Sequence, residues 1–318
     1  MLWLKYEDRL RIFVGVTDNG WFDFLSARQG VDEINFWQPG GNRQFRALQP
    51  GELFLFKLKG QRNAIAGGGY FAWSTMMPLA FAWAMFQEKN GAASLDALRR
   101  SLIRLRHNAG MDERDFQIGC VLLAHPFFFP EEQWIHVPDT FALNLTQGRG
   151  YDLTEPDGKR LWDAVHDRLT GQAMDQFLVD SARDERPDPR RVWVEMRLGQ
   201  ATFRSMVASA YDWRCAVTGE RVLPVLEAAH IQPYAAQGPN AVQNGLLLRA
   251  DIHRLMDEGY ATVTNDLRFD VSRHVRAEFE NGKDYYALLG KELRMPPSRI
   301  LWPASEYIAW HNQHTFRR

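Results

Sequence analysis

The alternation of apolar and polar positions is typical of strands and turns over residues 1–155. Short runs rich in aromatic and β-branched residues lie there between Gly, Pro and Asn. These runs are RIFVGVT, ELFLFKL, NAIAGGGYFAW, FQIGCVLLAHPFFF and QWIHVP. Two helical stretches interrupt them: PLAFAWAMFQEKN starts at Pro78, and SLDALRRSLIRL has Ser94 as its cap and leucines at helical spacing. The pattern predicts a small, mostly-β barrel with inserted helices.

The pattern changes after Glu155. RLWDAVHDRL has the apolar spacing of an amphipathic helix, and ARDERPDPRRV after it is charged and broken by Pro187 and Pro189. We therefore expect a helical and charged linker over 156–191, between one domain at 1–155 and another at 192–318.

The second domain contains a strand, a loop, a strand and a helix, with polar residues where they join. VLEAAHIQP has a period of two and places His230 at the end of a strand. The pair Asn244-Gly favours a tight turn. DIHRLMDEG then predicts a short helix in which His253 and Asp257 share one face. A helix at FRSMVASA should pack on this unit, ATVTNDLRFDVS should form a hairpin, and ILWPASEYIAWHNQHTF should end the chain as a docked helix.

This arrangement resembles that of metal-dependent nucleases, and its residue types suit the phosphodiester hydrolysis that the resemblance implies. A DNA phosphodiester has no neighbouring hydroxyl, so water must be activated and the leaving oxygen must be stabilised. His230 is the candidate base, because imidazole titrates near neutral pH. Asn244 would brace the loop that carries it, and His253 and Asp257 at helical spacing can share one metal. Glu227 is a weaker metal candidate, because alternation places it on the face of Ala229.

The segment from about 197 to 260 resembles the HNH nuclease motif, a ββα-metal fold that cuts with one divalent cation and one histidine. The preceding RLGQATFRSMVASAYDWRCAVTG resembles the start of HNH domains in restriction enzymes. The resemblance implies an α+β protein with a C-terminal HNH endonuclease domain. It implies catalytic roles for His230, Asn244 and His253, and Mg²⁺ or Mn²⁺ held by His253, Asp257 and Glu227.

The chain departs from that family at two places. Many HNH domains bind a structural zinc through two CxxC pairs, whereas this chain has Cys215-Ala-Val-Thr and then Arg249 and Ile252. One thiol is too few, so we expect no structural zinc. The residue before the base commonly supplies a metal ligand, and here it is Ala229.

Aromatic residues beside turns suggest a pocket in the first domain. WFDF, NFWQPGGNRQF and GGGYFAW place five of them there, and flat rings in a pocket can stack on a base: Trp21, Trp37, Tyr70, Phe71 and Trp73. The layout resembles PUA-like reader domains of the EVE, YTH and SRA types, which bind a modified or flipped base. An aromatic core without a ligand remains the alternative.

Composition limits the other possibilities. The 318 residues carry a formal net charge of −1, which disfavours a protein that coats nucleic acid by charge alone. The N-terminus has acidic residues where a signal peptide needs an apolar run, and no stretch is long enough for a membrane span. Two cysteines, Cys120 and Cys215, fall in different predicted domains. We expect a cytoplasmic protein.

The leading hypothesis is a restriction endonuclease that depends on methyl- or hydroxymethylcytosine in double-stranded DNA, and a homodimer is left open. One alternative is an HNH nuclease whose N-terminal domain binds protein or RNA. Another is a non-catalytic DNA-binding protein with a decayed HNH fold, which Ala229 and the missing zinc pairs would suit.

Overall fold

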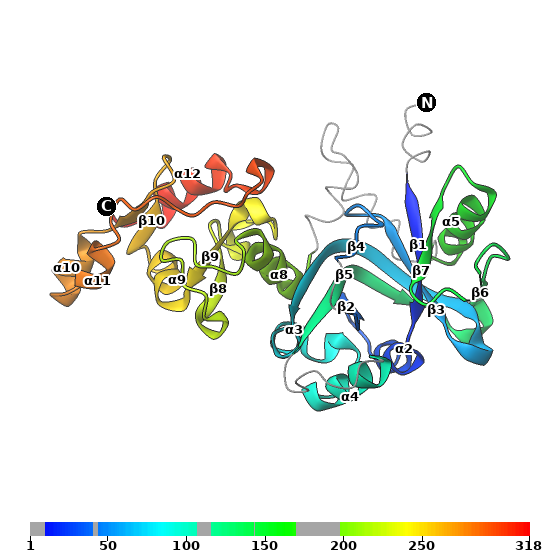
Figure 1. Cartoon of the computed structure of the whole chain (residues 1–318). Coiled ribbons are helices and arrows are strands. Elements are labelled where there is room, and N and C mark those ends of the chain that lie inside the picture. Colours follow the sequence, from blue (N-terminus) through cyan, green and yellow to red (C-terminus); the bar gives the residue numbers. More distant parts are fainter. Residues whose placement is uncertain (1–9, 41–43, 107–115, 143, 170–197) are drawn as a thin grey trace, which may run out of the picture. The chain divides into compact units, whose positions relative to one another are not determined.

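A computed structural model describes the chain in two units (Figure 1). The described residues are 10–40, 44–106, 116–142, 144–169 and 198–318. The units are Met1–Gly199 and Gln200–Arg318. Within the described ranges, no helix is both long and apolar enough to cross a membrane.

The N-terminal unit combines a seven-stranded sheet with α-helices, as the α+β prediction requires. Its strands are β1 (Arg11–Thr17), β2 (Glu33–Gln38), β3 (Leu53–Leu58), β4 (Ala64–Pro78), β5 (Gln117–Phe128), β6 (Ile135–His136) and β7 (Gly148–Asp152). Its α-helices are α2 (Asn19–Ser26), α3 (Leu79–Phe86), α4 (Leu95–Leu105) and α5 (Pro156–Leu169).

The sheet is ordered β2-β5-β4-β3-β1-β7, and β6 pairs with β4. β1 and β3 are parallel, and the other pairs are antiparallel. Irregular pairing at two points along β4 lets this long strand bend. β2 and β7 are the two edges of the hydrogen-bonded order in the described part of the chain. The described strands thus form one large sheet in an α+β unit.

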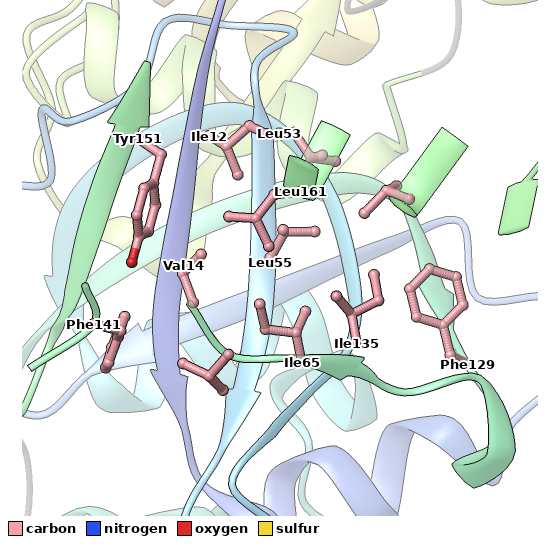
Figure 2. Close-up of a cluster of buried hydrophobic side chains, with 12 residues drawn as sticks. Ile12, Val14, Leu53, Leu55, Ile65, Phe129, Ile135, Phe141, Tyr151 and Leu161 are labelled. Carbon is pink, nitrogen blue, oxygen red and sulfur yellow. The ribbon is translucent and has the colours of Figure 1, made fainter. Parts of the chain in front are cut away.

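Helix α5 belongs to the N-terminal core (Figure 2). Its Leu161 and Val165 lie in the same buried cluster as Ile12, Val14 and Tyr151. The residues from 156 to 169 therefore differ from the linker expected there, because their apolar face is covered by β1 and β7. Pro187 and Pro189, on which the expected linker rested, lie outside the described residues.

Helix α4 was predicted from its N-cap residue, whereas helix α2 was not. Ser94 accepts the Ala97 N–H at 3.1 Å and starts α4, as predicted. α2 was not predicted, because Asp18-Asn-Gly suggests a turn. The Asp18 carboxylate instead accepts the Trp21 N–H at 3.0 Å and caps a helix that continues through WFDF.

The C-terminal unit holds the predicted strand, loop, strand and helix. Its elements are α8 (Gln200–Ala210), β8 (Leu226–His230), β9 (Gly245–Arg249), α9 (Ala250–Asp257), β10 (Ala261–Val263), β11 (Phe269–Val271), α10 (His274–Phe279), α11 (Lys283–Tyr286) and α12 (Ser305–His314). The helix expected at FRSMVASA is α8, which packs against β8 and β9. The expected hairpin is β10 and β11, and the expected terminal helix is α12, which packs against β10.

Candidate active site

His230 is the last residue of β8, directly opposite Gly245 at the start of β9. α8 approaches closely here: a Cβ on Gly245 would lie 2.5 Å from the Val207 side chain and 3.1 Å from the Phe203 ring. This close packing fixes the end of the hairpin against a helix. The loop that follows His230 therefore starts from a rigid point.

The imidazole of His230 is held on its face and on one edge. The Phe203 ring stacks on it with centroids 4.0 Å apart and planes 11° from parallel. Its Nε2 lies 2.8 Å from Asn240 Oδ1. Burial lowers the pKa of His230 below its usual value, although the Asn240 hydrogen bond opposes that shift. The ring is therefore a neutral imidazole at neutral pH, which is the form a general base needs.

Asn244 fastens the loop between the two strands. Its Nδ2 donates to the carbonyls of Gln232 at 2.9 Å and Pro239 at 3.0 Å, and its Oδ1 accepts the Gln232 N–H at 2.8 Å. Its side chain has no exposed surface. A Cβ on Gly238 would lie 1.9 Å from the Gln232 carbonyl oxygen, so only glycine fits this crossing.

His253 lies on α9 between two carboxylates. Its Nδ1 is 2.7 Å from Glu227 Oε2, and its Nε2 is 3.3 Å from Asp257 Oδ2. The three side chains are partly exposed. The four-residue spacing in the sequence predicted that His253 and Asp257 lie together. Glu227 joins them, because the strand face that it shares with Ala229 meets α9 at His253.

The donor set of this cluster suits a hard or borderline divalent cation. Carboxylate oxygens suit Mg²⁺ or Mn²⁺, and an imidazole nitrogen suits borderline divalent cations. Across the described residues, however, no group of three or more His, Cys, Asp or Glu side chains is already arranged as a metal cage. Both nitrogens of His253 face a carboxylate, so one of these contacts must open for a cation to bind.

At the place where many HNH domains hold zinc, this chain has an ion pair. The Arg249 guanidinium contacts the Asp251 carboxylate with both Nε and Nη2, at 2.8 and 2.5 Å. Tyr285 adds a hydroxyl 3.3 Å from the same carboxylate. Cys215 is a free, fully buried thiol.

The five aromatic residues predicted to bind a base divide into two groups. Trp21, Trp37 and Phe71 are buried, with 3%, 8% and 5% of their surface exposed. Both of these indoles donate to backbone carbonyls, of Asn35 and Asn90. These three side chains pack the core, which corrects their assignment to a pocket.

Tyr70 and Trp73 keep part of their surface exposed. Burial raises the pKa of the Tyr70 hydroxyl to about 12. The indole N–H of Trp73 is buried without a hydrogen-bond partner among the described residues. The N-terminal candidates for base contact therefore reduce to these two.

A cavity of about 660 Å³ lies elsewhere in the C-terminal unit, and none of the predicted site residues lines it. Its walls come from β10, β11, α12 and the end of the chain, with Thr264, Asp270, Arg273, Asn312 and Arg318 among them. The titratable groups with catalytic chemistry are those around His230 and His253. The candidate active site is therefore the group of residues around His230 and His253.

Two residues near His230 escaped the sequence analysis. Asn240 looks like part of a Gly-Pro-Asn loop, and Phe203 like an ordinary apolar position of α8. Their contacts join residues 10 and 27 positions away from His230. Such pairings depend on the tertiary fold, and no local spacing signals them.

Comparisons with known proteins agree with this geometry at the C-terminal unit. Residues 215–264 match the HNH endonuclease family. No curated protein matches the sequence. Among solved structures, one similar chain is a "Modification dependent TagI restriction endonuclease", 15% identical over 94% of this chain and 80% of that chain, with a TM-score of 0.28. The family match, on a ββα unit with His230 and His253, identifies residues 215–264 as an HNH endonuclease domain and the chain as a nuclease.

Proposed function

We propose that this chain cuts double-stranded DNA by hydrolysis, with His230 as the general base. The observation that carries the proposal is the state of His230: a strand-end imidazole, held by Phe203 and Asn240, whose pKa is lowered by burial. A neutral imidazole at the edge of a loop can take a proton from water. Asn244 supports this role by holding the loop after His230.

His253 and Asp257 would hold one Mg²⁺ or Mn²⁺. Glu227 at Nδ1 fixes the His253 ring with its hydrogen on that nitrogen, which leaves the Nε2 lone pair beside Asp257. Glu227 then orients a ligand, instead of being one. A cation at this position supplies charge stabilisation for the leaving 3′ oxygen.

For the N-terminal unit we propose the reading of a modified cytosine, through Tyr70 and Trp73. A nuclease that acts on foreign DNA needs a means of sparing other DNA, and a separate reader would provide it. Partly exposed aromatic faces can stack on a base. The buried, unpaired indole N–H of Trp73 in the described chain also departs from the rule that buried donors are satisfied.

We also propose a cytoplasmic setting and a homodimer. Cys120 and Cys215 are both buried free thiols, which suits a reducing, cytoplasmic location. One HNH domain per chain provides one base for one strand. A homodimer would bring two such domains to the two strands of a duplex, and sedimentation of the complex with DNA would test it.

A plasmid-nicking assay tests the catalytic proposal. We expect His230→Ala to reduce the cleavage rate about 10²- to 10⁴-fold, with DNA binding retained because a base acts in the transition state. His274→Ala, at an exposed histidine paired with Glu278, is the matched control and should cut normally. Chelation should stop the wild type. Cleavage by His230→Ala at the wild-type rate would show that the base is misassigned.

A further inference from the structure

The loop after β8 brings a second asparagine to the catalytic histidine. Asn240 is buried, with 7% of its surface exposed, and its Oδ1 lies 2.8 Å from His230 Nε2. An amide oxygen can only accept a hydrogen bond, so the hydrogen between these two atoms must belong to the imidazole. In neutral His230 this places the ring hydrogen on Nε2 and the lone pair on Nδ1.

Asn244 holds both members of this pair in position. It binds the backbone of Gln232, two residues after His230, and the carbonyl of Pro239, directly before Asn240. Ile231 N–H also donates to the Asn244 carbonyl at 2.9 Å. The two ends of the loop are thus tied to one side chain, and the distance from Asn240 to the imidazole is set by that brace.

We propose that Asn240 is a positioning residue that fixes His230 in the Nε2–H tautomer, so that Nδ1 is the nitrogen that accepts the proton of the attacking water. The inference rests on the proposed role of His230 as the base. The hydrogen bond made by one ring nitrogen decides which form the other takes. Phe203 supplies the second constraint, because its stacked ring prevents the imidazole from turning out of its plane.

The proton balance of the step follows from this arrangement. The water O–H bond breaks as the new O–P bond forms, and the proton moves to Nδ1. His230 becomes an imidazolium whose Nε2–H still donates to Asn240 Oδ1. The bond from phosphorus to the 3′ oxygen then breaks, and its electron pair stays on that oxygen. His230 returns its proton to solvent before the next cycle.

The amide also suits this place better than a carboxylate. A carboxylate at 240 would favour the charged imidazole and raise the pKa of the base. It would also add a negative charge that competes with Asp257 for a cation. A neutral acceptor selects the tautomer without either effect.

The experiment measures the tautomer directly in the full chain. We expect the ¹⁵N spectrum of the wild type to show His230 with hydrogen on Nε2, assigned by its absence from His230→Ala. Asn240→Asp keeps an acceptor, so it should keep this signature at a pH above the raised pKa of its His230, where the imidazole is neutral. Asn240→Leu, similar in size but without an acceptor, should lose it and populate both tautomers. The wild-type spectrum decides the question even if Asn240→Leu does not fold.

Kinetics separate positioning from general support of the loop. Asn240→Leu should lower kcat by about 10- to 100-fold, a part of the 10²- to 10⁴-fold that a general base contributes, with KM changed less than about twofold because DNA binding is not involved. Gln232→Ala is the matched control: it removes a bond to the Ala236 carbonyl in the same loop and should leave the tautomer and kcat unchanged.

Three outcomes would overturn the inference: a wild-type His230 with hydrogen on Nδ1, an unchanged kcat in Asn240→Leu, or an equal loss in Gln232→Ala. A failure of the proposed function looks different. In that case His230→Ala itself still cuts DNA, whatever its neighbours do. If His230→Ala is inactive and the wild-type ring carries Nδ1–H, only the role of Asn240 is wrong.

Discussion

The aromatic residues of the N-terminal unit and the polar residues of the C-terminal unit differ in their roles. In the N-terminal unit, aromatic residues that looked like ligand contacts are largely absorbed by packing: Trp21 sits edge-on between Phe36 and Phe56. In the C-terminal unit, polar residues scattered along the sequence come together, as His253 does with Glu227 and Asp257. Burial stabilises an aromatic side chain in any apolar core. A histidine held between two carboxylates is not explained by packing in this way.

This contrast teaches how far each residue type can identify a site. Burying an aromatic side chain is favourable by itself, so an aromatic cluster has a structural explanation at once. Bringing titratable groups together costs desolvation, so their clustering points to a function more strongly. Gly91 illustrates the first case: its φ is +73°, and a Cβ there would strike the Trp21 ring at 2.1 Å. Core packing alone therefore requires that glycine.

The largest expected effect is the loss of stability when the N-terminal unit is truncated before α5. A fragment of residues 1–169 should be soluble and folded, whereas one of residues 1–155 should aggregate or unfold. The shorter fragment lacks Leu161 and Val165, and each such side chain contributes about 1.5–3 kcal/mol when fully buried. Circular dichroism and thermal melting of both fragments provide the measurement. If both fragments melt alike, α5 is not part of the core.

Substitution of a buried aromatic residue should mainly reduce stability, whereas substitution of a partly exposed one should mainly reduce DNA binding. Trp21→Ala should lower the free energy of unfolding by about 3–5 kcal/mol, the range for a buried aromatic. Trp73→Ala should cost less stability but weaken binding to duplexes with methyl- or hydroxymethylcytosine by about 1–3 kcal/mol, the value of one stacked base. Urea unfolding and binding to matched duplexes that differ only at cytosine C5 measure the two effects.

Trp21→Ala is also the control for the binding measurement with the matched duplexes. Trp21→Ala should keep whatever preference the wild type shows, at concentrations of urea where it stays folded. An equal affinity of the wild type for all three cytosine forms would contradict the reader proposal, and so would an unchanged preference in both Trp73→Ala and Tyr70→Ala.

Much of the C-terminal unit could be predicted because its signals are local. The alternation in VLEAAHIQP, the Asn244-Gly pair and the four-residue spacing of His253 and Asp257 each report on a few neighbouring residues. The structure places all of them in a β8, β9 and α9 unit. Glu227 was a weaker candidate for the same reason: alternation gives the face of a strand but not what covers that face.

The N-terminal unit shows where local signals stop. β2 was missed because EINFWQ is followed by Pro-Gly-Gly and resembles a loop, yet it pairs with β5 along its whole length. The apolar side of α5 was recognised, but its partners Ile12 and Val14 lie about 150 residues earlier in the chain. Long-range packing decides whether an amphipathic helix is a linker or part of a core.

The smallest effect should come from His311, a buried polar residue of the C-terminal unit with a structural role. It lies on α12 with 3% of its surface exposed. Its Nε2–H donates to the Met256 carbonyl at 3.1 Å, and its Nδ1 lies 2.8 Å from the Thr262 hydroxyl. Burial lowers its pKa, so the folded protein resists protonation there. The unfolded chain takes up that proton near pH 6.5.

The sign of the pH dependence follows from this difference. Between the lowered pKa of folded His311 and about pH 6.5, the unfolded state binds more protons, so stability falls as the pH falls through this window and is independent of this group above it. One such proton accounts for at most about 1.4 kcal/mol per pH unit.

His311→Asn should be less stable at pH 7.5 but should lose part of that slope. His230, whose pKa is also lowered, contributes in the same direction in both proteins. Thermal melts of the two chains from pH 5 to pH 8 measure the difference, and equal slopes would mean that His311 is protonated in the folded state or accessible to water. A reduced slope would show that burial holds His311 neutral in the folded protein.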